Sequence, residues 1–230
     1  MDDLTVIYLT MNRMPESWVT YHKHHLLGAV GGYPVISISR EPIDIGQNLI
    51  DDDEPGYANI YRQLLRGAKM ADTPFVAMAE DDVLYSPEHF REFRPRLDEV
   101  AYNRSRWSVF AWDRTLYSLR NRVSNCTLIA PRDYLIDALE ERFTKAPLEK
   151  LSRESQGFGE VGRHAIERSL GVTPRNMVEY WSWVPVVHLS HIDGTEERQT
   201  RKRKRHAQIR AYDIPYWGKA STIVDRYIGG

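Results

Sequence analysis

Three consecutive carboxylates stand at the end of a short apolar run. Residues 75–85 read "FVAMAEDDVLY", so Glu80, Asp81 and Asp82 follow five apolar residues and precede another apolar stretch. Neighbouring carboxylates repel one another and are costly unless a cation or hydrogen-bond donors neutralise them. Mg²⁺ and Mn²⁺ bind carboxylate and phosphate oxygens. The run therefore indicates a divalent-metal site that is shared with a diphosphate, and a solvated acidic turn is the alternative.

Two histidines close a later apolar run. Residues 184–191 read "VPVVHLSH", which places His188 and His191 at the end of an expected strand. Imidazole is a competent ligand for metals of the Mn²⁺ type, although a histidine at a strand end is more often structural. The sequence does not choose between the two.

Strands and helices alternate over the first 95 residues. Ser86 and Pro87 have the residue types of a helix cap and a first helical position, and residues 43–56 lack periodicity and are expected to form a loop. The expected strands cover residues 4–10, 33–39 and 74–79, and the expected helices cover residues 17–27, 57–71 and 86–93. Such alternation predicts an α/β fold with a mainly parallel sheet flanked by helices. Ligands of such sheets lie beyond the carboxyl ends of the strands, where the three carboxylates fall.

The second half has a different pattern. Expected strands at 106–113, 124–130 and 181–189 are interspersed with expected helices at 131–143 and 160–171. We expect one catalytic domain over residues 1–195, with a nucleotide-binding half at 1–95 and an acceptor half at 96–195. Residues 196–230 then form a basic C-terminal lid or tail that packs on the domain.

Composition excludes several classes of protein. The chain has 230 residues, a formal net charge of −1 and one cysteine, Cys126, so a disulfide framework is excluded and a reducing compartment is expected. The N-terminus lacks the basic residues of a signal peptide, and no stretch has the length of a membrane span. We therefore expect a cytoplasmic protein.

The stretch "AMAEDDVLYSPEHF" resembles the acidic strand-end motif of GT-A fold glycosyltransferases, especially the family 2-like group. The resemblance extends to "VIYLTMNR", "PVISISREP" and "YRQLLRGAKMADTPF", and so covers roughly the first 95 residues. It implies a glycosyltransferase that uses Mn²⁺ or Mg²⁺ to move a sugar from a nucleotide-sugar donor, a UDP-sugar before others, to an acceptor hydroxyl. Glu80 departs from a strict Asp-any-Asp motif, which leaves open which carboxylate binds the metal.

The resemblance also implies roles for individual residues. Asp82 is expected to bind the metal together with His188 or His191, and Glu80 or Asp81 to contact the ribose or a metal-bound water. Further nucleotide contacts are expected from the other strand ends and the second helix, although the family usually has an acidic residue where this chain has Arg40. These expected nucleotide-binding residues are Thr10, Asn12, Arg13, Arg40 and Arg62.

Two carboxylates are candidates for the general base that an inverting reaction needs. Glu160 lies in "GFGE", which resembles a Gly-aromatic-Gly-Glu segment of several GT-A enzymes, and Asp113 in "AWDR" is its rival. Alternatively, Glu160 is an acidic residue in the first turn of a helix, where it interacts favourably with the helix dipole and has no catalytic role. The basic run "RQTRKRKRH", residues 198–206, includes Arg201 and Arg203, which are expected to close over the diphosphate.

The basic run leaves other functions open, and missing motifs exclude several classes of nucleotide-binding protein. The basic run is also consistent with a nucleic-acid-binding protein, or with a glycosyltransferase that acts on modified DNA bases, so the acceptor is open and can be anionic. The nearly neutral charge and the lack of a known binding motif count against the first. The sequence lacks a P-loop, a dinucleotide-binding glycine motif after a strand, and the glycine-rich loop of sugar nucleotidyltransferases.

Overall fold

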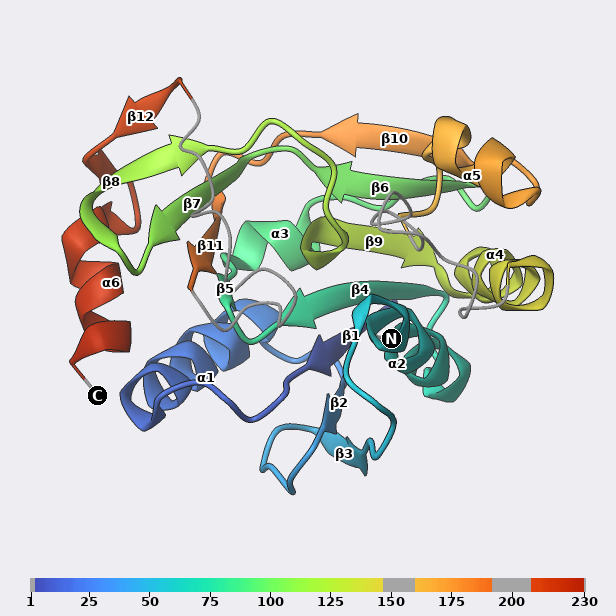
Figure 1. Ribbon diagram of the computed structural model, residues 1–230, viewed down its shortest axis with the longest axis horizontal. Helices are drawn as coiled ribbons and strands as arrows, with labels where there is room; N and C mark the ends of the chain where they lie inside the picture. The colour runs from blue at the N-terminus through green and yellow to red at the C-terminus, as the bar shows by residue number, and fades with distance from the viewer. Residues whose placement is uncertain (1–2, 147–159, 192–207, 230) are drawn as a thin grey trace.

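The protein folds around a seven-stranded sheet. The computed structural model describes residues 3–146, 160–191 and 208–229 (Figure 1). The strand order is β10-β6-β9-β4-β1-β2-β3, and every pair is parallel except those that β9 makes with β4 and β6. The strands are β1 (Leu4–Leu9), β2 (Val35–Ser39), β3 (Gln47–Ile50), β4 (Phe75–Glu80), β6 (Glu99–Asn103), β9 (Leu128–Pro131) and β10 (Asn176–Tyr180). The predicted α/β class with a mainly parallel sheet is confirmed.

A second sheet of five strands follows the acidic turn. Its order is β12-β8-β7-β11-β5. Only Asp81 and Asp82 separate the end of β4 from the start of β5, so the chain passes from one sheet to the other at these two residues. The strands are β5 (Val83–Leu84), β7 (Arg106–Phe110), β8 (Asp113–Leu119), β11 (Val186–Ser190) and β12 (Arg210–Ala211). A short hairpin of β13 (Asp213–Ile214) and β14 (Gly218–Lys219) precedes the last helix.

Helices cover both faces of the large sheet, and each side has its own core (Figure 1). α2 and α4 pack on one face, α1 and α3 pack on the other, and α6 packs with α1 against the second sheet. The helices are α1 (Glu16–Val30), α2 (Tyr57–Met70), α3 (Pro87–Arg91), α4 (Arg132–Lys145), α5 (His164–Leu170) and α6 (Ala220–Ile228), with a 3₁₀ turn η1 (Asn125–Thr127).

α2 lies very close to the sheet because its sequence provides a glycine at the contact. A Cβ atom on Gly67 would lie 2.6 Å from Cγ2 of Ile7 in β1, so a larger residue there would push the helix away. Tyr61 and Leu64 on the same face are buried, as the amphipathic pattern predicts.

Three local expectations were wrong. α1 does not end at Gly28 but continues to Val30, because Ala29 and Val30 pack in the core and the positive φ of +64° falls at Gly31. Residues 43–56 are not all loop: β3 forms an exposed edge strand, whose polar residues conceal the alternation that would reveal it. α5 begins only at His164, four residues later than expected.

The described C-terminal residues pack on the rest of the chain. The indole Nε1 of Trp217 donates to the carbonyl oxygen of Pro185 at 2.7 Å, and the hydroxyl of Tyr117 donates to the carbonyl oxygen of Gly218 at 2.9 Å. Ile223 and Val224 of α6 are fully buried. In the described ranges, no helix combines the length and the apolar character needed to cross a membrane.

Candidate active site

The acidic turn lies where the two sheets meet. Asp81 and Asp82 form the turn, and Val83 begins β5. β5 pairs with β11 so that His188 lies opposite Val83, and the amide of Leu189 donates to the carbonyl oxygen of Asp82 at 2.7 Å. Backbone pairing therefore fixes the strand that carries His188 beside the carboxylates.

Two side chains of α1 hold the backbone of the same turn. The indole Nε1 of Trp18 donates to the carbonyl oxygen of Asp81 at 2.7 Å. The Nε2 of His22, one helical turn later, lies 2.9 Å from the carbonyl oxygen of Val83 and 3.1 Å from that of Glu80. Burial lowers the pKa of His22 to about 4, so its ring is neutral and donates through Nε2. The sequence analysis missed both residues, and the available signal was two aromatic rings with polar tips spaced i, i+4 on an expected helix.

Asp82 brings the two predicted histidines together. Its Oδ2 lies 3.2 Å from Nε2 of His188 and 3.8 Å from Nε2 of His191. The other ring nitrogen of His188, Nδ1, lies 3.4 Å from the hydroxyl of Ser108 and 3.3 Å from that of Ser190. The structure therefore brings these three side chains together, and both histidines lie beside the carboxylate.

The donor atoms of this cluster are of the types that divalent cations bind. Oδ1 of Asp82 and Nδ1 of His191 are buried, and neither has a hydrogen-bond partner within the described residues. Two ligands of one octahedral ion, each about 2.1 Å from it, lie about 3 Å apart, which is close to the 3.2 Å between Asp82 and His188. In the described ranges, however, no group of three or more His, Cys, Asp or Glu side chains is arranged to hold a metal ion. The cluster is therefore a hydrogen-bonded one that contains the residue types of metal ligands.

The two aspartates of the turn have opposite protonation behaviour. Burial and the charge of Asp82 raise the pKa of Asp81 to about 6, against the hydrogen bond that Thr10 donates to it at 2.6 Å. Burial alone would raise the pKa of Asp82 too, but the charges and hydrogen bonds of His188 and His191 lower it well below its usual range. Asp82 is therefore the carboxylate that stays ionised, as a metal ligand must.

The end of β1 is tied to the end of β2 by one side chain. Asn12 has a left-handed φ of +56°, and its Oδ1 accepts hydrogen bonds from the amides of Arg40 at 2.8 Å and Glu41 at 3.1 Å. The amide of Asn12 in turn donates to the hydroxyl of Thr10 at 3.0 Å. These contacts give Asn12 a positioning role at the strand ends where nucleotide contacts were expected.

Arg40 is engaged by an aspartate that the sequence analysis did not single out. Its Nη1 donates to the carbonyl oxygen of Asp51 at 2.7 Å, and its Nη2 lies 3.5 Å from the carboxylate of Asp51. Asn59 and Gln63 of α2 donate to the same carboxylate at 2.8 and 2.7 Å. Both amide residues are buried although they are polar, because their side chains satisfy the carboxylate of Asp51.

The other two expected nucleotide-binding arginines among the described residues are exposed. Arg13 and Arg62 are exposed, the first after β1 and the second on α2. Arg201 and Arg203 lie outside the described residues.

Glu160 is a buried carboxylate beside β6. It is 8% exposed and forms an ion pair with Arg163, and its neighbour Val161 accepts a hydrogen bond at 2.9 Å from the hydroxyl of Tyr102, near the end of β6. β6 runs parallel to β4 with β9 between them, so the two strand ends are two spacings, about 10 Å, apart. Gly162 lies against Met177 near the start of β10, so these contacts tie the segment to β6 and β10, and none of them reaches the acidic turn.

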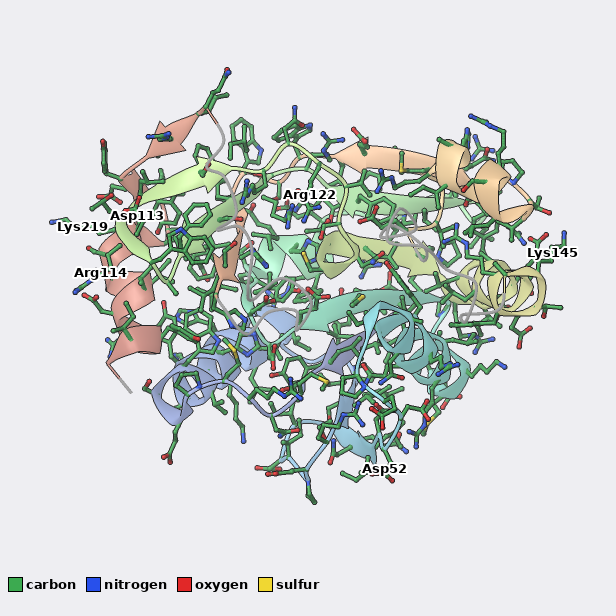
Figure 2. All side chains as sticks on the ribbon, viewed as in Figure 1. Asp52, Asp113, Arg114, Arg122, Lys145 and Lys219 are labelled. Atoms are coloured by element: carbon green, nitrogen blue, oxygen red, sulfur yellow. The ribbon has the colours of Figure 1, made fainter. Side chains whose placement is uncertain are left out.

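Asp113 is placed differently. It begins β8, and its Oδ1 accepts hydrogen bonds from the amide of Thr115 at 3.1 Å and from the hydroxyl of the same residue at 2.6 Å. Figure 2 shows Asp113 beside Arg114 at the end of the molecule where α6 lies, and Arg114 forms an ion pair with Asp225 of that helix. These local bonds give Asp113 the role of a turn residue.

A surface hollow lies at the other end of the large sheet. Its lining includes Glu99, at the start of β6, and Asn176, at the start of β10. It therefore faces away from the strand ends that carry the acidic turn, and we do not assign the site to it.

Comparison with known proteins gives matches in structure only. No protein-family model and no curated protein sequence matches the chain. Residues 1–349 of S. aureus TarS match 82% of this chain at 14% identity and a TM-score of 0.44, and the match spans 60% of the TarS chain, less than two thirds of its length. A glycosyltransferase involved in the glycosylation of the major capsid of PBCV-1 matches 85% of this chain, and 96% of its own, at 14% identity and a TM-score of 0.45.

A third match is a mutant Drosophila beta-1,4-galactosyltransferase 7 in complex with manganese, UDP-Gal and xylobiose. It covers 89% of this chain and 77% of its own, at 11% identity and a TM-score of 0.46.

Proposed function

We propose that the chain is a metal-dependent glycosyltransferase that moves a sugar from a nucleotide-sugar to an acceptor hydroxyl. The observation that carries the proposal is the cluster in which Asp82 meets His188 and His191. It joins an ionised carboxylate, two imidazoles and unpartnered buried donor atoms at the carboxyl edge of a mainly parallel sheet. That edge is where such sheets bind nucleotides.

The chain's own residues divide the work around this cluster. Asp82 and one or both histidines would hold Mn²⁺ or Mg²⁺, which neutralises the diphosphate as it leaves. Thr10 positions the carboxylate of Asp81, and Asn12 fixes the loop that follows β1. The nucleotide then lies over the ends of β1 and β2.

The acceptor would approach from the other side of β4. In an inverting reaction, the acceptor oxygen forms the new bond to the sugar, its proton passes to a carboxylate, and the bond from the sugar to the diphosphate breaks. We assign the proton to Glu160 because it is a buried carboxylate whose neighbour Val161 is hydrogen-bonded to Tyr102, near the carboxyl end of β6. Asp113 is less suited, because its carboxylate already accepts two hydrogen bonds from Thr115.

Metal-dependent nucleotide binding tests the proposal. Melting temperatures are measured with UDP, GDP, CDP and dTDP, each with and without Mn²⁺, for the wild type, Asp82→Asn and Asp52→Asn. Asp52 is exposed, so its variant makes the same change of charge away from the cluster (Figure 2). A nucleotide at one hundred times its dissociation constant stabilises a protein by about 2.7 kcal/mol.

We expect one nucleotide to raise the melting temperature only with Mn²⁺, and the effect to survive in Asp52→Asn and disappear in Asp82→Asn. Wild-type protein that melts cooperatively and ignores every nucleotide would contradict the proposal. Full nucleotide binding by Asp82→Asn would contradict the assignment of the metal site.

A further inference from the structure

A buried arginine has two N–H groups without a partner among the described residues. Arg106, the first residue of β7, is 2% exposed, and its Nε and Nη2 have no hydrogen-bond partner among the described residues. Its Nη1 lies 4.0 Å from Sγ of Cys126. Burial raises the pKa of that thiol to about 11, so the sulfur is neutral at physiological pH and does not balance the guanidinium. A buried charge left in this state is costly, which indicates that a ligand completes it.

More positive charge gathers at the same place. The amide of Arg120 donates to the carbonyl oxygen of Arg106 at 2.9 Å, so the two residues are neighbours. Burial, and then the charges of Arg106 and Arg122, lower the pKa of Arg120. Figure 2 shows Arg122 near the centre of the molecule, far from the α6 end. Positive charges gathered at a partly buried place attract an anion.

Ser108 connects these arginines to the proposed metal cluster. Its hydroxyl lies 3.4 Å from Nε of Arg120 and also 3.4 Å from Nδ1 of His188. Ser108 pairs with His188 in β11, and alternation along β7 places Arg106 on the same face of the second sheet. The opposite face, with Val109 and its neighbours, packs against α6.

The arginines lie on the side of the acidic turn away from the expected nucleotide. Arg106 follows the last residue of β6 by three positions, and β6 lies beyond β9 from β4. Thr10 and Arg40, at the ends of β1 and β2, lie on the other side of β4. An anion at Arg106 is therefore separated from the nucleotide by the turn.

We propose that Arg106 and Arg120 form a subsite for an anionic group, a carboxylate or a phosphate, carried by the acceptor or by the transferred sugar rather than by the nucleotide. Guanidinium groups suit this role because their paired N–H donors match both anions. The assignment to acceptor or sugar rests on the proposed glycosyl transfer, whereas the anion site itself does not.

Inorganic phosphate is the first probe. Melting temperatures are measured in phosphate and in chloride of equal ionic strength for the wild type, Arg106→Met, Arg106→Lys and the control Arg168→Met, at an exposed position of α5. Without phosphate, Arg106→Met should melt higher than the wild type, because a buried guanidinium with two N–H groups that lack a partner among the described residues is replaced by an apolar chain of similar length. Phosphate should raise the melting temperature of the wild type and Arg168→Met. Arg106→Met should lose about 10- to 100-fold in phosphate affinity, and Arg106→Lys should lose less.

Several results would overturn the subsite. A wild type that shows no phosphate effect, or an Arg106→Met that keeps it, removes the anion site. A lower melting temperature of Arg106→Met in chloride, combined with an unchanged phosphate effect in Arg106→Lys, would make Arg106 a structural residue.

Nucleotide binding separates this inference from the proposed function. Arg106→Met should bind the nucleotide and Mn²⁺ as the wild type does. If this variant loses nucleotide affinity as strongly as it loses phosphate affinity, the anion belongs to the nucleotide and the proposal is overturned. If the wild type binds phosphate through Arg106 but binds no nucleotide, the anion site stands and glycosyl transfer fails. UDP-glucuronate against UDP-glucose distinguishes the two sources: a preference for the acid that disappears in Arg106→Met assigns the anion to the sugar, and its absence assigns it to the acceptor.

Discussion

Replacing Asp81 with asparagine should stabilise the metal-free protein at neutral pH. The folded chain raises the pKa of this carboxyl from 3.8 to about 6, chiefly through burial and then through the charge of Asp82. A raised acid pKa means that the folded state binds the proton more tightly than the unfolded state does. The group therefore contributes nothing unfavourable below about pH 4, and costs stability increasingly as the pH rises towards 6.

The size of the effect follows from the shift. About 2.2 pKa units correspond to about 3 kcal/mol, and solvent that reaches the partly exposed turn reduces this to about 2 kcal/mol. Asn keeps an oxygen that accepts the hydrogen bond from Thr10. We therefore expect Asp81→Asn to melt about 4–8 °C above the wild type at pH 7.5, since 1 kcal/mol corresponds to about 2–4 °C in a chain of this size.

The assay is the difference in melting temperature between variant and wild type from pH 4 to pH 8, without metal. The difference cancels every other titrating group that the two proteins share. It should be near zero at pH 4 and grow to its full size by pH 7, and Asp52→Asn should show no such trend. A variant that is less stable than the wild type at pH 7.5, or a difference that shrinks as the pH rises, would refute the electrostatic account of the turn.

Three further predictions concern other parts of the chain. Burial lowers the pKa of His89 to about 3, so the unfolded state takes up the proton first and the free energy of unfolding falls as the pH drops below 6.5. By pH 5 this costs about 2 kcal/mol, and urea unfolding at pH 5 should show that His89→Gln recovers most of it. Arg142 donates to the fully buried carboxylate of Glu167 at 2.6 Å, so Arg142→Met should lower the free energy of unfolding by about 3–5 kcal/mol, and a loss below 1 kcal/mol would show that the pair contributes little. If transfer is inverting, Glu160→Gln should lower kcat at least 100-fold with donor binding unchanged, whereas Asp113→Asn should keep kcat within about threefold, and the opposite ranking would move the base to Asp113.

The sequence contained enough information for the parallel strands at the centre of the large sheet and for the side chains that meet at the acidic turn. Strands β1, β2 and β4 are short apolar runs, and their alternation with helices predicts a parallel sheet with Asp82 at its carboxyl edge. His188 in β11 and His191 just after it were singled out because they end an apolar run. Their closeness to Asp82 depends on the pairing of β5 with β11, about 105 residues apart in the chain, and no local pattern specifies that pairing.

What the sequence did not reveal depends on contacts between distant elements. Asn59 and Gln63 appear to belong to an exposed helix face until Asp51 is placed beside them. Trp18 and His22 look like ordinary residues of an amphipathic helix in the sequence. Only the fold shows that their ring nitrogens reach the carbonyl groups of the acidic turn. An arginine at position 106, in a strand rich in apolar residues, is unusual in the sequence. Its importance became clear only when the structure showed that the side chain is buried.

The position of the turn between the two sheets explains how charges of one sign can be held together. Asp82 is fixed by the amide of Leu189 on one side, and Trp18 holds the carbonyl oxygen of Asp81 on the other, so neither carboxylate can move away to relieve repulsion. Histidines offset the charge of Asp82, and below about pH 6 protonation offsets that of Asp81. On the far side of β4, the buried guanidinium of Arg106 has two N–H groups without a partner among the described residues. A substrate that brings a cation to the turn and an anion to Arg106 would relieve both costs in one binding event, which favours binding of the two over binding of either alone.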